Sequence, residues 1–168
     1  HAVHQGFIDT NPAANLDGVT APPMRHHYPA LPLERLPELI EHIEAYHQGR
    51  ELTRLAILLT LHLFIRSSEL RFARWSEIDF INRIWTIPAT REAIVGVRYS
   101  GRGAKMRTAH IVPLSQQAIA ILKRIKEISG AYELVFPGDH NPYRPMCENA
   151  VNKALRLMGF DTKQDICG

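Results

Sequence analysis

The fold is decided by the stretch Leu55-Ala56-Ile57-Leu58-Leu59-Thr60-Leu61-His62-Leu63-Phe64-Ile65, which ends directly at Arg66. Because this run is apolar on nearly all sides, it predicts a buried helix over residues 52–65. The guanidinium of Arg66 cannot be neutralised, and a charge in the core is costly unless it is paired or directed at an anion. Glu69 can supply the pair from the next helical turn, but the forked guanidinium also suits a phosphate. Both interpretations, a structural ion pair and an anion-binding arginine, stay open at this point.

Hydrophobic periodicity predicts further helices and strands around this run. Helices are expected from about 34–37 to 49, over 67–73, from a cap at Ser115 to Gly130, and last around 150–158 with Gly159 as its stop. The expected inner faces are Leu36, Ile40 and Ile43 in the first, Ala118, Ile121, Leu122, Ile125 and Ile128 in the third, and Ala150, Val151, Ala154, Leu155 and Met158 in the last. Short strands are expected at 84–87 and 109–113. The pattern predicts a mainly α protein with a small antiparallel β-sheet, the α+β class.

Composition limits the class of protein. With 168 residues, of which 45% are hydrophobic, the chain is long enough for one globular domain with a buried core. A net charge of +3 and a pI near 9.0 favour an anionic partner. Cys147 and Cys167 are too few for a disulfide framework and fit a reducing cytoplasm, and no apolar run is long enough to span a bilayer. We therefore expect a soluble cytoplasmic protein without a membrane partner.

Basic residues gather in one segment. No acidic residue occurs between Ala93 and Lys126, a range that includes Arg98, Arg102, Lys105, Arg107 and His110 around a glycine-containing turn. A solvated basic face would explain this pattern. A basic two-stranded hairpin would also suit the phosphates and grooves of a nucleic acid. A lysine in such a place can take part in proton transfer, because its pKa can be lowered by its surroundings.

Several ordered motifs resemble those of the tyrosine recombinases. The stretch Phe64-Ile65-Arg66-Ser67-Ser68-Glu69-Leu70-Arg71 resembles their first catalytic-arginine box, and residues 105–115 resemble the hairpin whose lysine precedes a Val-Pro-Leu strand. Asn11-Pro12-Ala13 is similar to the junction between a core-binding domain and a catalytic domain. Residues 133–138 and 158–160 fit the prophage and genomic-island integrase branch. The resemblance covers about residues 11–168.

The resemblance implies site-specific DNA recombination and integration through a phosphotyrosine intermediate, with no cofactor and no metal. Arg66 matches the arginine that clamps the phosphate, and Lys105 matches the general acid. Glu69 would support Arg66. The resemblance further implies DNA contacts from Arg98, Arg102, Arg107 and His110. The implied partners are double-stranded attachment-site DNA, a homo-tetramer assembled on it, and DNA-bending and excision accessory proteins.

Some family motifs do not occur in the sequence. The family's His-x-x-Arg box and its nucleophilic tyrosine would lie downstream of Gly168, and none of Tyr28, Tyr46, Tyr99, Tyr132 and Tyr143 stands where the nucleophile belongs. We therefore expect residues 1–28 to be a linker from an N-terminal core-binding domain and residues 29–168 to be the N-terminal part of a catalytic domain. Alone, this chain is expected to be inactive.

Two other classes of function compete with a recombinase. A non-catalytic DNA-binding module, or a degenerate integrase remnant, would share the basic residues but form no covalent bond to DNA. A metal enzyme would use some of the nine histidines, yet His26-His27 and the pair His42 and His47 lack helical ligand spacing.

Overall fold

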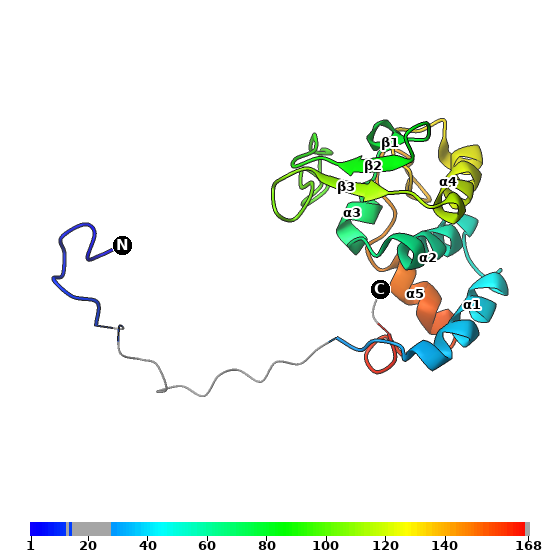
Figure 1. Cartoon of the computed structure of the whole chain (residues 1–168), viewed down its shortest axis with the longest axis horizontal. Helices are drawn as coiled ribbons and strands as arrows, with labels where there is room; N and C mark the ends of the chain where they lie inside the picture. The colour runs from blue at the N-terminus through cyan, green and yellow to red at the C-terminus, as the bar shows by residue number, and fades with distance from the viewer. Residues whose placement is uncertain (13, 15–27, 167–168) are drawn as a thin grey trace.

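Helix α2 (Glu51–Leu63) lies at the centre of the fold, as the apolar run predicts. The computed structural model describes residues 1–12, 14 and 28–166. In Figure 1 the small sheet and α4 lie on one side of α2, and α1 and α5 lie on the other. Leu52, Leu55, Ala56 and Leu59 of α2 are buried with the sheet and α4, whereas Ile57 packs with α1 and α5. One helix thus joins two hydrophobic clusters.

The other helices form at the predicted places, but α1 ends at Glu44 and not at the predicted Gly49. They are α1 (Leu36–Glu44), α3 (Ser67–Arg71), α4 (Gln116–Ser129) and α5 (Ala150–Leu157), with short 3₁₀ turns at Leu33–Arg35 and Trp75–Glu77. Ser115 caps α4 as expected, since its hydroxyl accepts a hydrogen bond from the backbone N–H of Ala118. No helix among these described residues is long and apolar enough to cross a membrane.

Two of the expected inner faces were partly wrong. Ile40 and Ile128 are exposed, and Leu39 and Ser129 are buried in their place. In α1 the buried side chains are Leu39 and Ile43, one helical turn apart, so Ile43 lies on the buried face as predicted and Leu39 takes the place expected for Ile40. Ser129 can be buried because its hydroxyl donates to the backbone carbonyl of Val135 at 2.7 Å.

The sheet has three antiparallel strands in the order β1-β2-β3. They are β1 (Ile78–Asp79), β2 (Ile84–Ile87) and β3 (His110–Pro113), so both predicted strands are present and β1 was missed. Trp85 of β2 pairs with Ile78 on one side and Val112 on the other, and its side chain is fully buried. The sheet therefore places its longest connection, residues 88–109 between β2 and β3, next to α3.

The end of α2 sets the direction in which Arg66 enters α3. Phe64 caps α2 in the left-handed conformation with φ 51°, its N–H donates to the carbonyl of Thr60, and its side chain is 87% exposed. An L-residue is disfavoured there, whereas glycine is not. We expect Phe64→Gly to be more stable than Phe64→Ala by about 0.5–1 kcal/mol in urea denaturation. Equal stabilities would show that the cap conformation carries no cost.

An ion pair between α2 and α4 predicts a pH dependence of stability. Both carboxylate oxygens of Glu51 accept hydrogen bonds from Arg124, at 2.8 and 3.0 Å, which lowers the pKa of Glu51 below its ordinary value. A carboxyl group whose pKa is lower in the folded state stabilises the fold above its unfolded pKa, and this contribution is lost as the pH falls through the folded pKa. On acidification the free energy of unfolding should therefore fall less in Glu51→Gln than in the unaltered chain. In the control Glu44→Gln, at an exposed position, it should fall as much as in the unaltered chain.

Candidate functional site

Arg66 and Glu69 form the predicted pair, but the buried member is Glu69. The Glu69 side chain is 3% exposed and that of Arg66 is 54% exposed. One carboxylate oxygen of Glu69 accepts from the Arg66 backbone N–H at 3.2 Å, and the other accepts from the Arg66 guanidinium at 3.1 Å. The Arg66 guanidinium lies outside the core because the left-handed cap at Phe64 ends the buried helix before Arg66. The guanidinium is thus oriented by one contact and keeps most of its N–H donors for a ligand.

Glu69 also reaches the segment that carries Lys105. The carboxylate oxygen that pairs with the Arg66 guanidinium lies 3.4 Å from the backbone N–H of Lys105, which donates to it. The Lys105 side chain is exposed. A single buried carboxylate therefore fixes the positions of both residues, which come from segments far apart in the sequence.

Arg66 and Lys105 line one open hollow of about 630 Å³, which we call the Arg66–Lys105 hollow. Its lining further includes Glu69, Ser68, Arg102 and Arg107. Of the predicted site residues, Arg98 and His110 are not part of this lining. Arg98 lies over the Tyr99 ring, and the exposed His110 begins β3 opposite Ile87. The hollow is basic, since Glu69 is its one acidic lining residue.

Residues 88–109 do not form the regular hairpin that the sequence suggested. The two strands β2 and β3 are antiparallel neighbours, but the basic residues 98, 102, 105 and 107 lie in the irregular connection between them. This connection folds back on itself through hydrogen bonds from Ala104 N–H to the Pro88 carbonyl at 2.8 Å and from Arg91 N–H to the Gly101 carbonyl at 3.0 Å. Gly103 permits this fold, because a Cβ there would collide with the backbone of Pro88 and Ala89.

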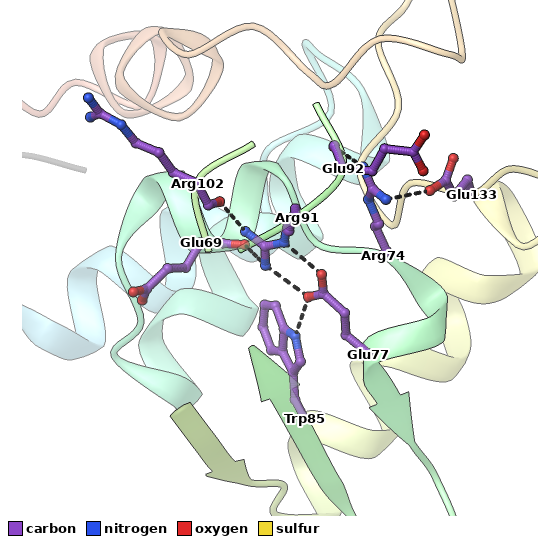
Figure 2. A network of polar contacts seen from close by, with 8 residues as sticks. All are labelled: Glu69, Arg74, Glu77, Trp85, Arg91, Glu92, Arg102 and Glu133. Atoms are coloured by element: carbon purple, nitrogen blue, oxygen red, sulfur yellow. Dashed lines mark hydrogen bonds and ion pairs between the residues drawn. The ribbon is translucent and has the colours of Figure 1, made fainter. Parts of the chain in front are cut away.

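A buried ion pair anchors the connection, and sequence reasoning missed it. Figure 2 shows Arg91 bonded to Glu77, with side chains that are 1% and 6% exposed, at 2.6 and 2.8 Å. Glu77 also accepts from the indole N–H of Trp85 at 2.9 Å. The Arg91 guanidinium donates to the backbone carbonyls of Arg102 at 3.3 Å and of Glu69 at 3.4 Å. Arg91 thus ties residues 88–109, which we call the basic connection, to α3. Nothing in the spacing of these residues indicates this contact.

A second contact holds the outer part of the connection. Arg74 donates to the backbone carbonyl of Glu92 at 2.6 Å and pairs with Glu133 at 3.0 Å, as Figure 2 shows. The backbone N–H of Trp75 donates to the backbone carbonyl of Glu133 at 3.1 Å. This bond holds the segment around residues 133–136 next to Arg74 and Trp75. The basic connection is therefore tied to the core at two places.

The arrangement can bind an anion. Among the described residues, the side chains of Arg98, Arg102, Lys105 and Arg107 form no ion pair. The guanidinium groups of Arg98 and Arg102 both lie over the Tyr99 ring, at 4.8 and 4.0 Å from its centroid. Within the same described part of the chain, no three His, Cys, Asp or Glu side chains are grouped so as to hold a metal ion. Unpaired cations around a preset arginine are the elements of a phosphate site.

Comparison with known proteins adds independent evidence. Residues 30–165 match the sequence profile of the Phage integrase family. The chain is 61% identical over 168 residues to the protein IntB of Escherichia coli (strain K12) and 54% identical to the integrase of Enterobacteria phage P4. It covers 42% and 38% of these two relatives, and thus spans about two fifths of their length.

Solved structures share the fold. A Tn1549 transposon integrase in complex with circular intermediate DNA superposes with a TM-score of 0.67 at 16% identity, over 94% of this chain and 54% of that one. A lambda integrase tetramer bound to a Holliday junction superposes with a TM-score of 0.62 at 19% identity, over 98% of this chain and 45% of that one. The mixed fold with its small antiparallel sheet is therefore that of tyrosine recombinase catalytic domains, as predicted.

Proposed function

This chain belongs to the phage integrase family, and on that premise we propose that it supplies part of the site at which a tyrosine recombinase cleaves and rejoins duplex DNA during site-specific integration. One observation carries the proposal: Arg66 and Lys105 line the same open hollow, and both are fixed by the buried carboxylate of Glu69. A structural ion pair alone would not require a half-exposed guanidinium beside an exposed lysine.

The proposed reaction is a phosphoryl transfer that conserves bond energy. A tyrosine oxygen attacks the phosphorus of one DNA phosphodiester, the bond to the 5′-oxygen breaks, and a phosphotyrosyl link remains. Attack by a 5′-hydroxyl of another strand reverses the step, so neither ATP nor a metal is needed. Arg66 would stabilise the charge that develops on the non-bridging oxygens, and Lys105 would protonate the leaving 5′-oxygen. Glu69 would act as the positioning residue for both.

The nucleophile would come from outside the hollow. None of the residues that line the Arg66–Lys105 hollow is a tyrosine. We therefore propose that the 168-residue chain alone forms no covalent adduct with DNA. Arg102 and Arg107 would hold the DNA backbone at the hollow, and Arg98 and His110 would contact it outside. The proposed partners are attachment-site duplexes, further copies of the protein in a tetramer, and accessory proteins that bend DNA.

A chimaera tests the proposal. In this protein the chain replaces the matching segment of the phage P4 integrase, to which it is 54% identical. Incubated with a nicked duplex that carries the phage's integration site, the chimaera should form a covalent adduct that survives denaturing electrophoresis. The 168-residue chain alone should form none. A chimaera that binds the duplex and forms no adduct would favour the second candidate, a non-catalytic DNA-binding module. The unpaired cations of the basic connection support this candidate as well.

The general-acid role predicts a chemical rescue. Lys105→Ala in the chimaera should leave duplex binding nearly unchanged and slow cleavage by about 10²–10⁴-fold. A substrate with a 5′-thio leaving group, which needs less protonation, should restore the rate. Lys123→Ala, which removes an exposed lysine on α4, serves as the control and should cleave both substrates at the unaltered rate. If the thio substrate is cleaved as slowly as the ordinary one, Lys105 does not act as the general acid.

A further inference from the structure

Tyr99 lines a second basic hollow. It has a volume of about 410 Å³, and its charged lining residues are Arg71, Arg98, Arg144 and Glu148. It shares no lining residue with the Arg66–Lys105 hollow. Its walls come from α3, from the connection 88–109, and from the segment around residues 144–148, so the fold assembles it from three separate parts of the chain.

Two of its three guanidinium groups have no carboxylate partner. Arg71 donates to the backbone carbonyl of Met146 at 2.7 Å and lies 3.8 Å from Glu148, the one acidic lining residue. Among the described residues, Arg98 and Arg144 form no ion pair. Arg98 lies over the Tyr99 ring, and a guanidinium nitrogen of Arg144 approaches the turn at Gly96, which has φ 71°. The hollow thus keeps a positive charge, because Glu148 faces three arginines and pairs only with Arg71.

A third hollow connects the two basic ones. Its lining includes Ser68 and Arg102 of the Arg66–Lys105 hollow and Arg71, Tyr99 and Glu148 of the second. The three hollows therefore adjoin one another along the protein surface, with unpaired cations at both ends. Regularly spaced phosphates along one polymer would satisfy both ends at once, which a single small anion would not.

We propose that Arg98 and Arg144 together bind a DNA backbone phosphate other than the one held by Arg66 and Lys105. This proposal rests on the proposed function, since it needs duplex DNA at the cleavage site. The second phosphate contact fixes the register of the duplex on the protein and carries no base preference. Glu148 opposes the bound phosphate and limits the affinity, because its carboxylate lines the same hollow.

The test measures binding of the 168-residue chain to a fluorescent duplex at several salt concentrations. Each phosphate contact contributes about 0.9 to the slope of log K against log salt, so the double variant Arg98→Gln/Arg144→Gln, which removes one contact, should lower the magnitude of the slope by about 0.9. The matched control Arg83→Gln/Lys123→Gln removes the same charge from another hollow that those two residues line. It should leave the slope close to that of the unaltered chain. Glu148→Gln should tighten binding at low salt.

Each outcome decides the matter. Equal slopes for the double variant and its control, in a chain that binds DNA, would overturn the second phosphate site and leave the proposed function standing. A chain that shows no salt-dependent duplex binding would contradict the proposed DNA partner, and this proposal with it. A titration with inorganic phosphate tests the remaining alternative, a site for a free anion. If phosphate shifts the side-chain NMR signals of Arg98 and Arg144 while the double variant binds the duplex normally, the hollow binds a free anion and the DNA assignment is wrong.

Discussion

Arg66→Ala in the chimaera is expected to abolish covalent adduct formation, with a loss of at least about 10²–10³-fold in cleavage rate. The guanidinium is half exposed, oriented by a buried carboxylate, and keeps donors for the non-bridging oxygens of a phosphate. Its removal takes away stabilisation of the transition state, which no better leaving group replaces. The 5′-thio substrate should therefore fail to rescue Arg66→Ala, in contrast to Lys105→Ala. Denaturing electrophoresis of time points on both substrates measures this difference.

Two controls separate this role from folding. Arg83→Ala removes an exposed arginine outside the hollow and should retain the cleavage rate. The unfolding free energy of Arg66→Ala should fall by less than that of Arg91→Ala, because the buried Glu69 carboxylate keeps its hydrogen bonds from the backbone N–H groups of residues 66 and 105. Cleavage by Arg66→Ala at a near-normal rate would return Arg66 to the purely structural interpretation.

Arg91→Ala is expected to destabilise the chain by about 3–5 kcal/mol, the largest stability effect among the substitutions considered. The change leaves the carboxylate of Glu77 uncompensated in the core, where its side chain is 6% exposed. It also removes the donor to the backbone carbonyls of Glu69 and Arg102, so the basic connection loses its anchor beside α3. Urea denaturation of the 168-residue chain measures the loss.

A paired substitution distinguishes the uncompensated charge from the lost packing. Arg91→Met/Glu77→Gln removes both charges and should recover a substantial part of the stability lost in Arg91→Ala. If it recovers stability but the corresponding chimaera cleaves slowly, Arg91 positions Lys105 through the connection. A loss below about 1 kcal/mol for Arg91→Ala would contradict the buried ion pair, since such a small effect is typical of exposed pairs.

The sequence predicted the parts of the fold that depend on local pattern. Periodicity located the helices, and the Ser115 cap and the Gly159 stop are where the residue types place them. Ile40 and Ile128 were wrongly placed on the inner faces because i+3 and i+4 spacings both fit a helical face, and hydrophobicity favoured Ile128 over the buried Ser129. Strand β1 was missed because its two residues are too few for a recognisable alternation.

The sequence predicted those residues of the site that belong to recognisable motifs. Arg66, Glu69 and Lys105 lie together, with Arg102 and Arg107 beside them, whereas their roles in catalysis and DNA binding stay predictions. The sequence did not predict that Glu69 is buried and Arg66 half exposed, because this difference depends on the turn at Phe64. It also did not predict the ion pair of Arg91, which joins residues that only tertiary packing brings together. Half of the predicted linker 1–28, residues 13 and 15–27, lies outside the described residues, and the linker likewise stays a prediction.

The most direct measurement is a crystal structure of the chimaera bound to a duplex that carries its integration site. The account predicts one phosphate of the DNA backbone within hydrogen-bond distance of both the Arg66 guanidinium and the Lys105 ammonium, with Glu69 still bonded to Arg66. A duplex bound with that hollow empty, and Arg66 contacting Glu69 alone, would contradict the claim that this chain forms part of a DNA-cleavage site.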